Sequence, residues 1–327
     1  MKLKRILASL IIFQLIFYGF SLTVTMAQAL TSRSATASTY IERGNAWFAK
    51  GDYEHALADF DLAVASDPNY AAAYYNRGIT RYRMRNYERA IADFNRVIQI
   101  NPRFIKAYID RASLLYVLGD LDGVIKDCNK VIEMEPRFAI AWNNRGLARG
   151  DKGDLVGALA DFDRAIYHDP RRCEFYNNRG VMRFRTGEIN GAISDQERAL
   201  KLNPEFVEAW SDRGAARQYK GDLDGALADY RQAIKLNPRF ANAWFNLGML
   251  RKVKGELERA EADFTRVIEL NPHMADAYAQ RGLVRLLRGR TDEADQDFDL
   301  CLALNKNLQQ SLEQLITETK QKMAGLK

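Results

Sequence analysis

The residues of this chain best able to do chemistry are arginines and aspartates that recur every 34 residues. Two arginine columns lie four residues apart, so they share one helix face, where guanidinium groups can bind phosphate or carboxylate. An aspartate follows the first arginine position by sixteen residues. The arginines are Arg43, Arg77, Arg111, Arg145, Arg179, Arg213 and Arg281, then Arg81, Arg149, Arg183, Arg217, Arg251 and Arg285; the aspartates are Asp59, Asp93, Asp127, Asp161, Asp195, Asp229, Asp263 and Asp297. We favour a structural interpretation, an Arg–Asp ladder between two helices, because a recognition site is rarely identical in every unit.

A second group of residues varies from one period to the next, as a binding surface in a repeat array should. Asparagines gather at two adjacent positions, and aromatic residues occur at one of these positions and six to seven residues later. Amides both donate and accept, so they can pair with the backbone of an extended peptide, while the aromatic rings form pockets. The alternative is that the asparagines cap or bridge neighbouring helices. The candidate binding residues of this group are Tyr75, Asn76, Tyr82, Tyr116, Asn143, Asn144, Asn177, Asn178, Phe184, Phe245 and Asn246.

Cysteine and histidine show no pattern that indicates catalysis or metal binding. Cys128, Cys173 and Cys301 are far apart in the sequence, and the three histidines occupy three different positions of the period. Metal sites and disulfide frameworks need closer pairing than this. We therefore expect no metal, no cofactor and no enzymatic activity.

The elements that position these residues follow from the prolines. All seven prolines stand 34 residues apart, a fixed period that indicates a solenoid. The prolines are Pro68, Pro102, Pro136, Pro170, Pro204, Pro238 and Pro272. Taking proline as position 32 of the unit gives eight repeats, each with two helices: 37–70, 71–104, 105–138, 139–172, 173–206, 207–240, 241–274 and 275–308.

Small and aromatic residues at fixed positions predict how the two helices of a repeat pack. Position 8 is glycine in every repeat except the third, which has Ala112, and position 20 is nearly always alanine. Aromatic residues at positions 4 and 24 are predicted to be large buried side chains. Cys128 and Gln196 break the second aromatic column, so we expect repeats three and five to pack less well.

These motifs resemble the tetratricopeptide repeat (TPR) family, in a bacterial variant. The resemblance rests on Tyr75-Asn76-Arg77-Gly78 in a first helix and Ala90-Ile91-Ala92-Asp93-Phe94 in a second, repeated over about five-sixths of the chain. It implies an all-α fold, an α-solenoid forming a right-handed superhelix. The first helices would line a concave groove that binds peptides or partner proteins.

One branch of this family grips a peptide's terminal carboxylate with five residues of a basic clamp. Asn45, Asn76 and Lys106 match that pattern, which adds Asn45 and Lys106 to the candidate binding residues. Ile41 and Asp110 stand where the resemblance requires lysine and arginine. An acid at such a site repels a carboxylate, so the sequence argues against a working clamp.

Both ends of the chain carry further signals. Residues 1–29 combine a basic start, an apolar stretch from Ile6 to Thr25 and the segment Ala27-Gln28-Ala29, as in a secretory signal peptide. The alternative is an uncleaved membrane anchor. Residues 30–36 form a polar lead-in, and Thr31–Thr39 is expected to be flexible. Residues 309–327 are predicted to form a capping helix through a stripe of apolar side chains: Leu308, Leu312, Leu315 and Ile316.

The net charge and the expected location of the protein limit the classes of function that it can have. The net charge is +6, and removing the three basic residues of the leader leaves +3, which gives no support for nucleic-acid binding. We expect an exported protein, periplasmic or secreted, that touches a membrane only through an uncleaved leader. The favoured function is a non-enzymatic scaffold binding an extended peptide or protein. The alternative is an accessory subunit of a cell-envelope polysaccharide or peptidoglycan enzyme.

Overall fold

The computed structural model describes residue 33 and residues 35–325. The predicted signal peptide, its cleavage site and the alternative anchor lie outside these residues. Every regular element in the described part of the chain is helical, and no helix there is long and apolar enough to span a membrane. The chain divides into two compact units, residues 1–148 and 149–327, which we call unit 1 and unit 2.

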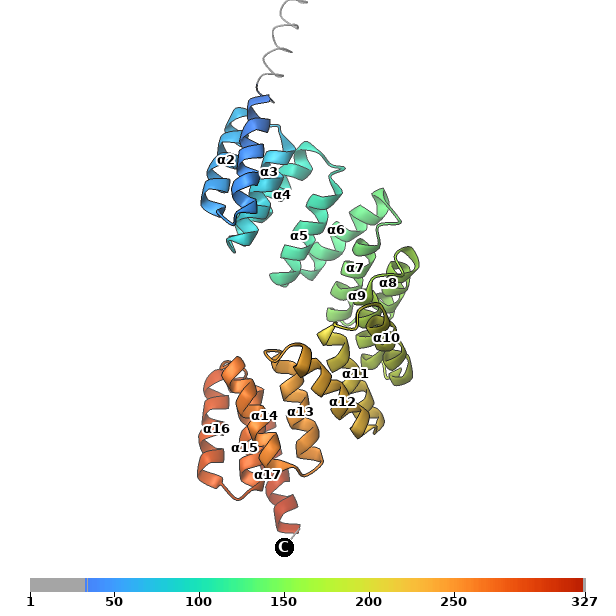
Figure 1. The fold of residues 1–327 in the computed structure, drawn as a ribbon, viewed down its shortest axis with the longest axis vertical. Helices are drawn as coiled ribbons and strands as arrows, with labels where there is room; N and C mark the ends of the chain where they lie inside the picture. The colour runs from blue at the N-terminus through green and yellow to red at the C-terminus, as the bar shows by residue number, and fades with distance from the viewer. Residues whose placement is uncertain (1–32, 34, 326–327) are drawn as a thin grey trace, which may run out of the picture. The chain divides into compact units, whose positions relative to one another are not determined.

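Unit 1 consists of antiparallel helix pairs, each pair one predicted repeat (Figure 1). Residues 35–49 are helical and precede α2 (Tyr53–Ser66). The next pairs are α3 (Ala71–Arg83) with α4 (Tyr87–Ile100) and α5 (Ile105–Val117) with α6 (Leu121–Met134). Helix α7 (Ala139–Asp151) begins in unit 1 and ends in unit 2. The flexible stretch predicted up to Thr39 is wrong for residues 35–39, because Ala37 is fully buried and holds this segment in the first helix.

Unit 2 repeats the same pattern. Its helices are α8 (Leu155–His168), α9 (Cys173–Arg185), α10 (Ile189–Leu202), α11 (Val207–Lys220), α12 (Leu223–Leu236), α13 (Ala241–Val253), α14 (Leu257–Leu270), α15 (Ala275–Leu287) and α16 (Thr291–Leu304). The first helices of successive repeats also touch, α9 with α11, α11 with α13 and α13 with α15. A 3-10 turn (Lys306–Leu308) leads into the final helix α17 (Gln309–Gly325).

The two helices of a repeat approach closely at the position 8 glycine, and the contact on the second helix is the aromatic ring at position 24. A Cβ added to Gly44 would lie 2.6 Å from the ring of Phe60, and one added to Gly282 would lie 2.5 Å from that of Phe298. These rings are at most 6% exposed. The close approach therefore requires glycine at this position wherever position 24 is aromatic.

Repeats three and five solve the same packing problem differently. In repeat three, Ala112 faces the small side chain of Cys128, and both are buried, so the added methyl group occupies space that the missing ring leaves. In repeat five, Gln196 is 1% exposed, and its Oε1 has no hydrogen-bond partner among the residues that the structure describes. The predicted weakness thus applies to repeat five, because an unsatisfied buried amide oxygen costs about 1–3 kcal/mol.

The aromatic residues at position 4 are less buried than predicted. Tyr108 and Tyr176 are buried, but Trp142, Trp210 and Trp244 are only partly covered. Each of these indoles donates its N–H to the carbonyl oxygen of the proline six residues earlier, at 2.8–3.0 Å. Their polar edge therefore remains at the surface while the ring packs inward.

The last helix caps the array, and it begins at Gln309 as predicted. Leu312 is 3% exposed and packs with Ala279 and Leu283 of α15. Leu308 and Ile316 pack against the same cluster, but Leu315 is 37% exposed and does not belong to the packed face. Met323, two turns after Ile316, lies on that face instead.

Candidate functional site

The arginine columns bind the chain's own aspartates. In six repeats the first-column arginine forms a two-pronged pair with the aspartate of the second helix; Arg111 Nε and Nη2, for example, lie 2.8 and 2.5 Å from the Asp127 oxygens. Arg77 adds a third contact, 2.7 Å from Asp61 on the preceding repeat's second helix. The six pairs are Arg43–Asp59, Arg77–Asp93, Arg111–Asp127, Arg179–Asp195, Arg213–Asp229 and Arg281–Asp297. The ladder interpretation is confirmed, and these guanidinium groups are occupied structurally.

The first helices of neighbouring repeats are joined by a second set of polar contacts. A side chain at position 5 bonds to one at position 6 of the next repeat. The pairs are Tyr75–Asp110 at 2.6 Å, Asn177–Asp212 at 2.9 Å and Ser211–Asn246 at 3.3 Å. Asn76 also bonds to Asn45, at 3.0 Å. Asn76, Asn177 and Asn246 therefore bridge neighbouring helices, which was the alternative interpretation of the asparagines.

In unit 1 the predicted binding residues are mostly engaged in packing. The ring of Tyr75 lies 5.0 Å from that of Phe104, centroid to centroid, and its hydroxyl donates to Asp110. Asn143 bonds to Asn144, which lines a small hollow of about 170 Å³ together with Tyr116. Tyr82 is 40% exposed at the end of α3.

The basic clamp pattern is interrupted in space as well as in sequence. Lys106 lies one turn before Asp110, and its charge opposes the rise that burial causes in the pKa of this carboxyl. Ile41, in the other departing position, is buried. The two departing positions are therefore a partly buried acid and a buried apolar side chain.

A pocket lies on the first-helix face of unit 2. It measures about 440 Å³ and is lined from three successive first helices, α9, α11 and α13, and the residue before α13. It brings together four predicted residues, Asn177, Asn178, Phe245 and Asn246. Residues that the sequence interpretation missed complete the pocket: Val181, Glu208, Ser211, Asp212, Phe240 and Asn242. We call this the unit 2 pocket.

Two acidic side chains and no basic one of the described residues line the unit 2 pocket. The pKa of Asp212 is raised to about 6, mainly by burial and in smaller part by the charge of Glu208, one turn earlier on α11. The amide of Asn177 opposes this rise by donating a hydrogen bond of 2.9 Å. Asn177 itself is 5% exposed, and its Oδ1 has no hydrogen-bond partner in the described part of the chain. The pocket can therefore accept hydrogen bonds and positive charge.

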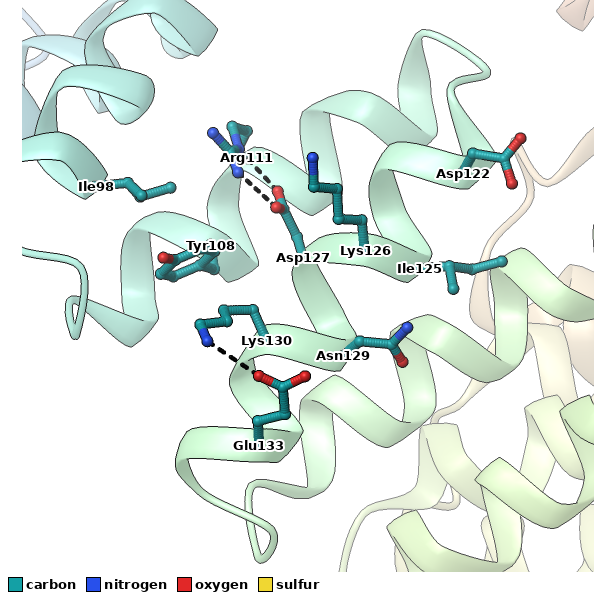
Figure 2. A pocket seen from close by; sticks show the side chains of 10 residues that line it. All are labelled: Ile98, Tyr108, Arg111, Asp122, Ile125, Lys126, Asp127, Asn129, Lys130 and Glu133. Atoms are coloured by element: carbon teal, nitrogen blue, oxygen red, sulfur yellow. Dashed lines mark hydrogen bonds and ion pairs between the residues drawn. The ribbon is translucent and has the colours of Figure 1, made fainter.

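A larger hollow in unit 1 has a different character. It measures about 610 Å³ and lies over α5 and α6, with Ile98 of α4 at one side (Figure 2). Three basic and three acidic side chains line it, and Figure 2 shows Arg111 pointing at Asp127 and Lys130 at Glu133. Arg111 and Asp127 belong to the ladder, and Lys130 lies 3.0 Å from Glu133. With these charges balanced, this hollow offers a ligand less than the unit 2 pocket does.

Phe184, the remaining predicted aromatic residue, lines none of these three hollows. Phe184, near the end of α9, packs edge to face against Tyr219 of α11, with ring centroids 5.6 Å apart. Tyr219 is 72% exposed. No group of three or more metal-ligating side chains exists within residues 33 and 35–325.

Comparisons with known proteins agree with this architecture. A family model for the TPR repeat matches residues 44–84 and 218–252, and three tetratricopeptide repeat models match 71–104 with 241–274, 109–172, and 174–206. A tetratricopeptide repeat protein from Parabacteroides merdae has a similar structure, with 19% identity and a TM-score of 0.66 over 76% of this chain and 99% of that one.

A second similar structure is the APC/C hetero-tetramer Cut9–Hcn1, with 16% identity and a TM-score of 0.66. The match covers 85% of this chain and 54% of that one. At these identities the likeness concerns the fold alone. No curated protein matches the chain in sequence.

Proposed function

Because the chain belongs to the tetratricopeptide repeat family, a fold that generally serves as a non-catalytic interaction scaffold, we propose that it binds an extended peptide segment of a partner protein in the unit 2 pocket. The observation that carries this proposal is the composition of the pocket. Three first helices contribute amides, two rings and two carboxylates to one continuous surface. A peptide offers complementary groups at each of these points.

The dimensions of the pocket suit an extended chain. Packed helices lie about 8–10 Å apart, so three of them span roughly 20 Å. An extended peptide rises about 3.3 Å per residue, which places about six residues across the pocket. Asn178, Asn242 and Asn246 carry amides that can pair with its backbone, and Phe240 and Phe245 supply apolar surface for its side chains.

The setting of this interaction is part of the proposal. The leader, residues 1–29, would deliver the repeats to the periplasm or the exterior, so the partner would be an envelope or secreted protein. The array would have no catalytic activity of its own.

Selection from a random peptide library tests the proposal. The purified full chain should enrich a family of related peptides. Phe245→Ala with Asn178→Ala should weaken their binding at least tenfold without changing helicity by circular dichroism. Tyr167→Ala, at a 76% exposed aromatic residue of α8 outside the pocket, is the matched control and should bind normally.

Two results would count against the proposal. One is the absence of any enriched peptide. The other is binding to immobilised envelope glycan that survives high salt and that peptides do not compete for, which would favour the accessory-subunit alternative.

A further inference from the structure

We infer that the unit 2 pocket selects a lysine or arginine side chain of the bound peptide. This inference rests on the proposed function and specifies its chemistry. Glu208 and Asp212 are the charged residues that line the pocket, and neither forms a salt bridge with a basic side chain of the described chain. A cationic ligand group would supply the missing partner.

Asp212 is the pocket carboxylate that a cationic partner would stabilise most. Its carboxylate accepts one hydrogen bond, from Asn177, and Glu208 stands one helical turn away with the same charge. A partly buried carboxylate next to a second acid is destabilised, and an approaching ammonium or guanidinium group relieves both effects. The ladder aspartates, by contrast, have arginine partners within the chain.

At the equivalent position in unit 1, the charge of an aspartate is balanced by a basic side chain of the same helix. Asp110 occupies the same position of its repeat as Asp212, and it also accepts from position 5 of the preceding repeat. There the residue one turn earlier is Lys106 rather than Glu208. The donor is the large side chain of Tyr75 rather than Asn177, and its ring packs on Phe104. Beside Asp212 a glutamate stands in place of that cation, and Asn177 of repeat five, smaller than Tyr75, stands in place of the ring.

The rest of the pocket suits the remainder of such a side chain. Phe240 and Phe245 offer ring surface for an aliphatic stem or for a cation held over a ring. An arginine presents several N–H donors in a plane, so it can contact both oxygens of a carboxylate.

The positive net charge of the protein means that a preference for basic peptides would point to a local acidic site. With a net charge of +6, long-range attraction favours acidic peptides over basic ones. A preference for a basic residue at one peptide position must therefore come from a local site.

The experiment sequences the peptides that the full chain selects from a random library, then measures the affinity of one of them. We expect lysine or arginine enriched at one fixed position. Replacing an arginine there by citrulline, or a lysine by acetyl-lysine, removes the charge and keeps the stem of the side chain; either change should weaken binding about tenfold or more, as a charge-assisted contact requires.

Three protein variants locate the effect. Asp212→Asn should bind the charged peptide and its neutral counterpart about equally, while Asp110→Asn, which removes one acid at the matching position in unit 1, should keep the full preference. Glu208→Gln, at an exposed side chain, provides a second test in case Asp212→Asn does not fold.

Each other outcome has a defined meaning. Peptides that bind without a basic preference, or a preference that Asp212→Asn retains, would overturn the cation site and leave the scaffold proposal standing. If no peptide is selected, both fail. If Asp110→Asn abolishes the preference, the site lies elsewhere and the inference is wrong.

Discussion

Replacing Asp212 by asparagine should make the stability of the protein less dependent on pH. The pKa of Asp212 is about 6 in the folded chain, against an ordinary value of 3.8. Between these two pH values the folded state keeps a proton that the unfolded state has lost, so the free energy of unfolding falls as the pH rises through this window. At 1.36 kcal/mol for each pH unit the loss is about 3 kcal/mol. Because solvent reaches this partly buried carboxyl, we expect about 2 kcal/mol.

Asparagine at position 212 does not titrate and can still accept the hydrogen bond from Asn177. The stability of the variant relative to the wild type should therefore increase by about 2 kcal/mol between pH 4 and pH 7.5. Asp263, whose pKa burial also raises to about 6, titrates equally in both proteins and cancels in the difference. Urea unfolding followed by circular dichroism at four pH values measures it. A difference that stays constant with pH, or that changes in the opposite direction, would refute the argument.

Three further predictions concern packing and backbone, and urea unfolding tests each. Gln196→Phe should raise the free energy of unfolding by about 1–3 kcal/mol, because it removes an unsatisfied buried amide and Gly180 leaves room for the ring; a loss of stability would contradict this. Cys128→Phe should lower the free energy of unfolding by about 1–3 kcal/mol, because the new ring clashes with Ala112, and adding Ala112→Gly should restore most of that stability. If the double variant lost the sum of the two single losses, the two positions would not compete for space. Arg85→Gly should stabilise the protein by about 0.5–1 kcal/mol, because Arg85 has a φ of 60° in the turn where other repeats have glycine; Arg83→Gly, at the last residue of α3, is the control and should not stabilise.

Much of the fold could be predicted because each structural requirement recurs in every repeat. The proline period predicts the repeat boundaries, and the arginine and aspartate columns predict the ladder. Position 8 glycine predicted the close approach of two helices. The capping helix was predicted to its first residue, Gln309, although Leu315 turned out to face solvent because the packed stripe continues through Met323.

The pocket was only half visible in the sequence, for a physical reason. Its polar contacts join position 5 of one repeat to position 6 of the next, so they connect residues 35 apart rather than residues in one column. A pattern within one repeat position indicates Asn177 and Phe245 as binding residues, but it does not indicate Asp212. The contrast between Lys106 and Glu208 at position 2 was a usable signal, because it reverses the charge beside an otherwise equivalent aspartate.

The repeat pattern also does not show whether a side chain faces solvent or a neighbouring repeat. Tyr75 was predicted as a binding residue from its type and position, and the structure packs its ring against Phe104 and ties its hydroxyl to Asp110. An aromatic residue at position 5 can face a ligand or a neighbouring repeat, and the sizes of side chains in the next repeat decide between them. The local period does not contain that information.

The central claim, that the unit 2 pocket holds the bound peptide, is tested most directly by photo-crosslinking. A benzophenone amino acid in place of Val181, which lines the pocket, should capture a peptide selected from the library. The same group in place of Val156, 80% exposed on α8 and outside the pocket, should capture none above background. Efficient capture at position 156 with none at position 181 would contradict the account.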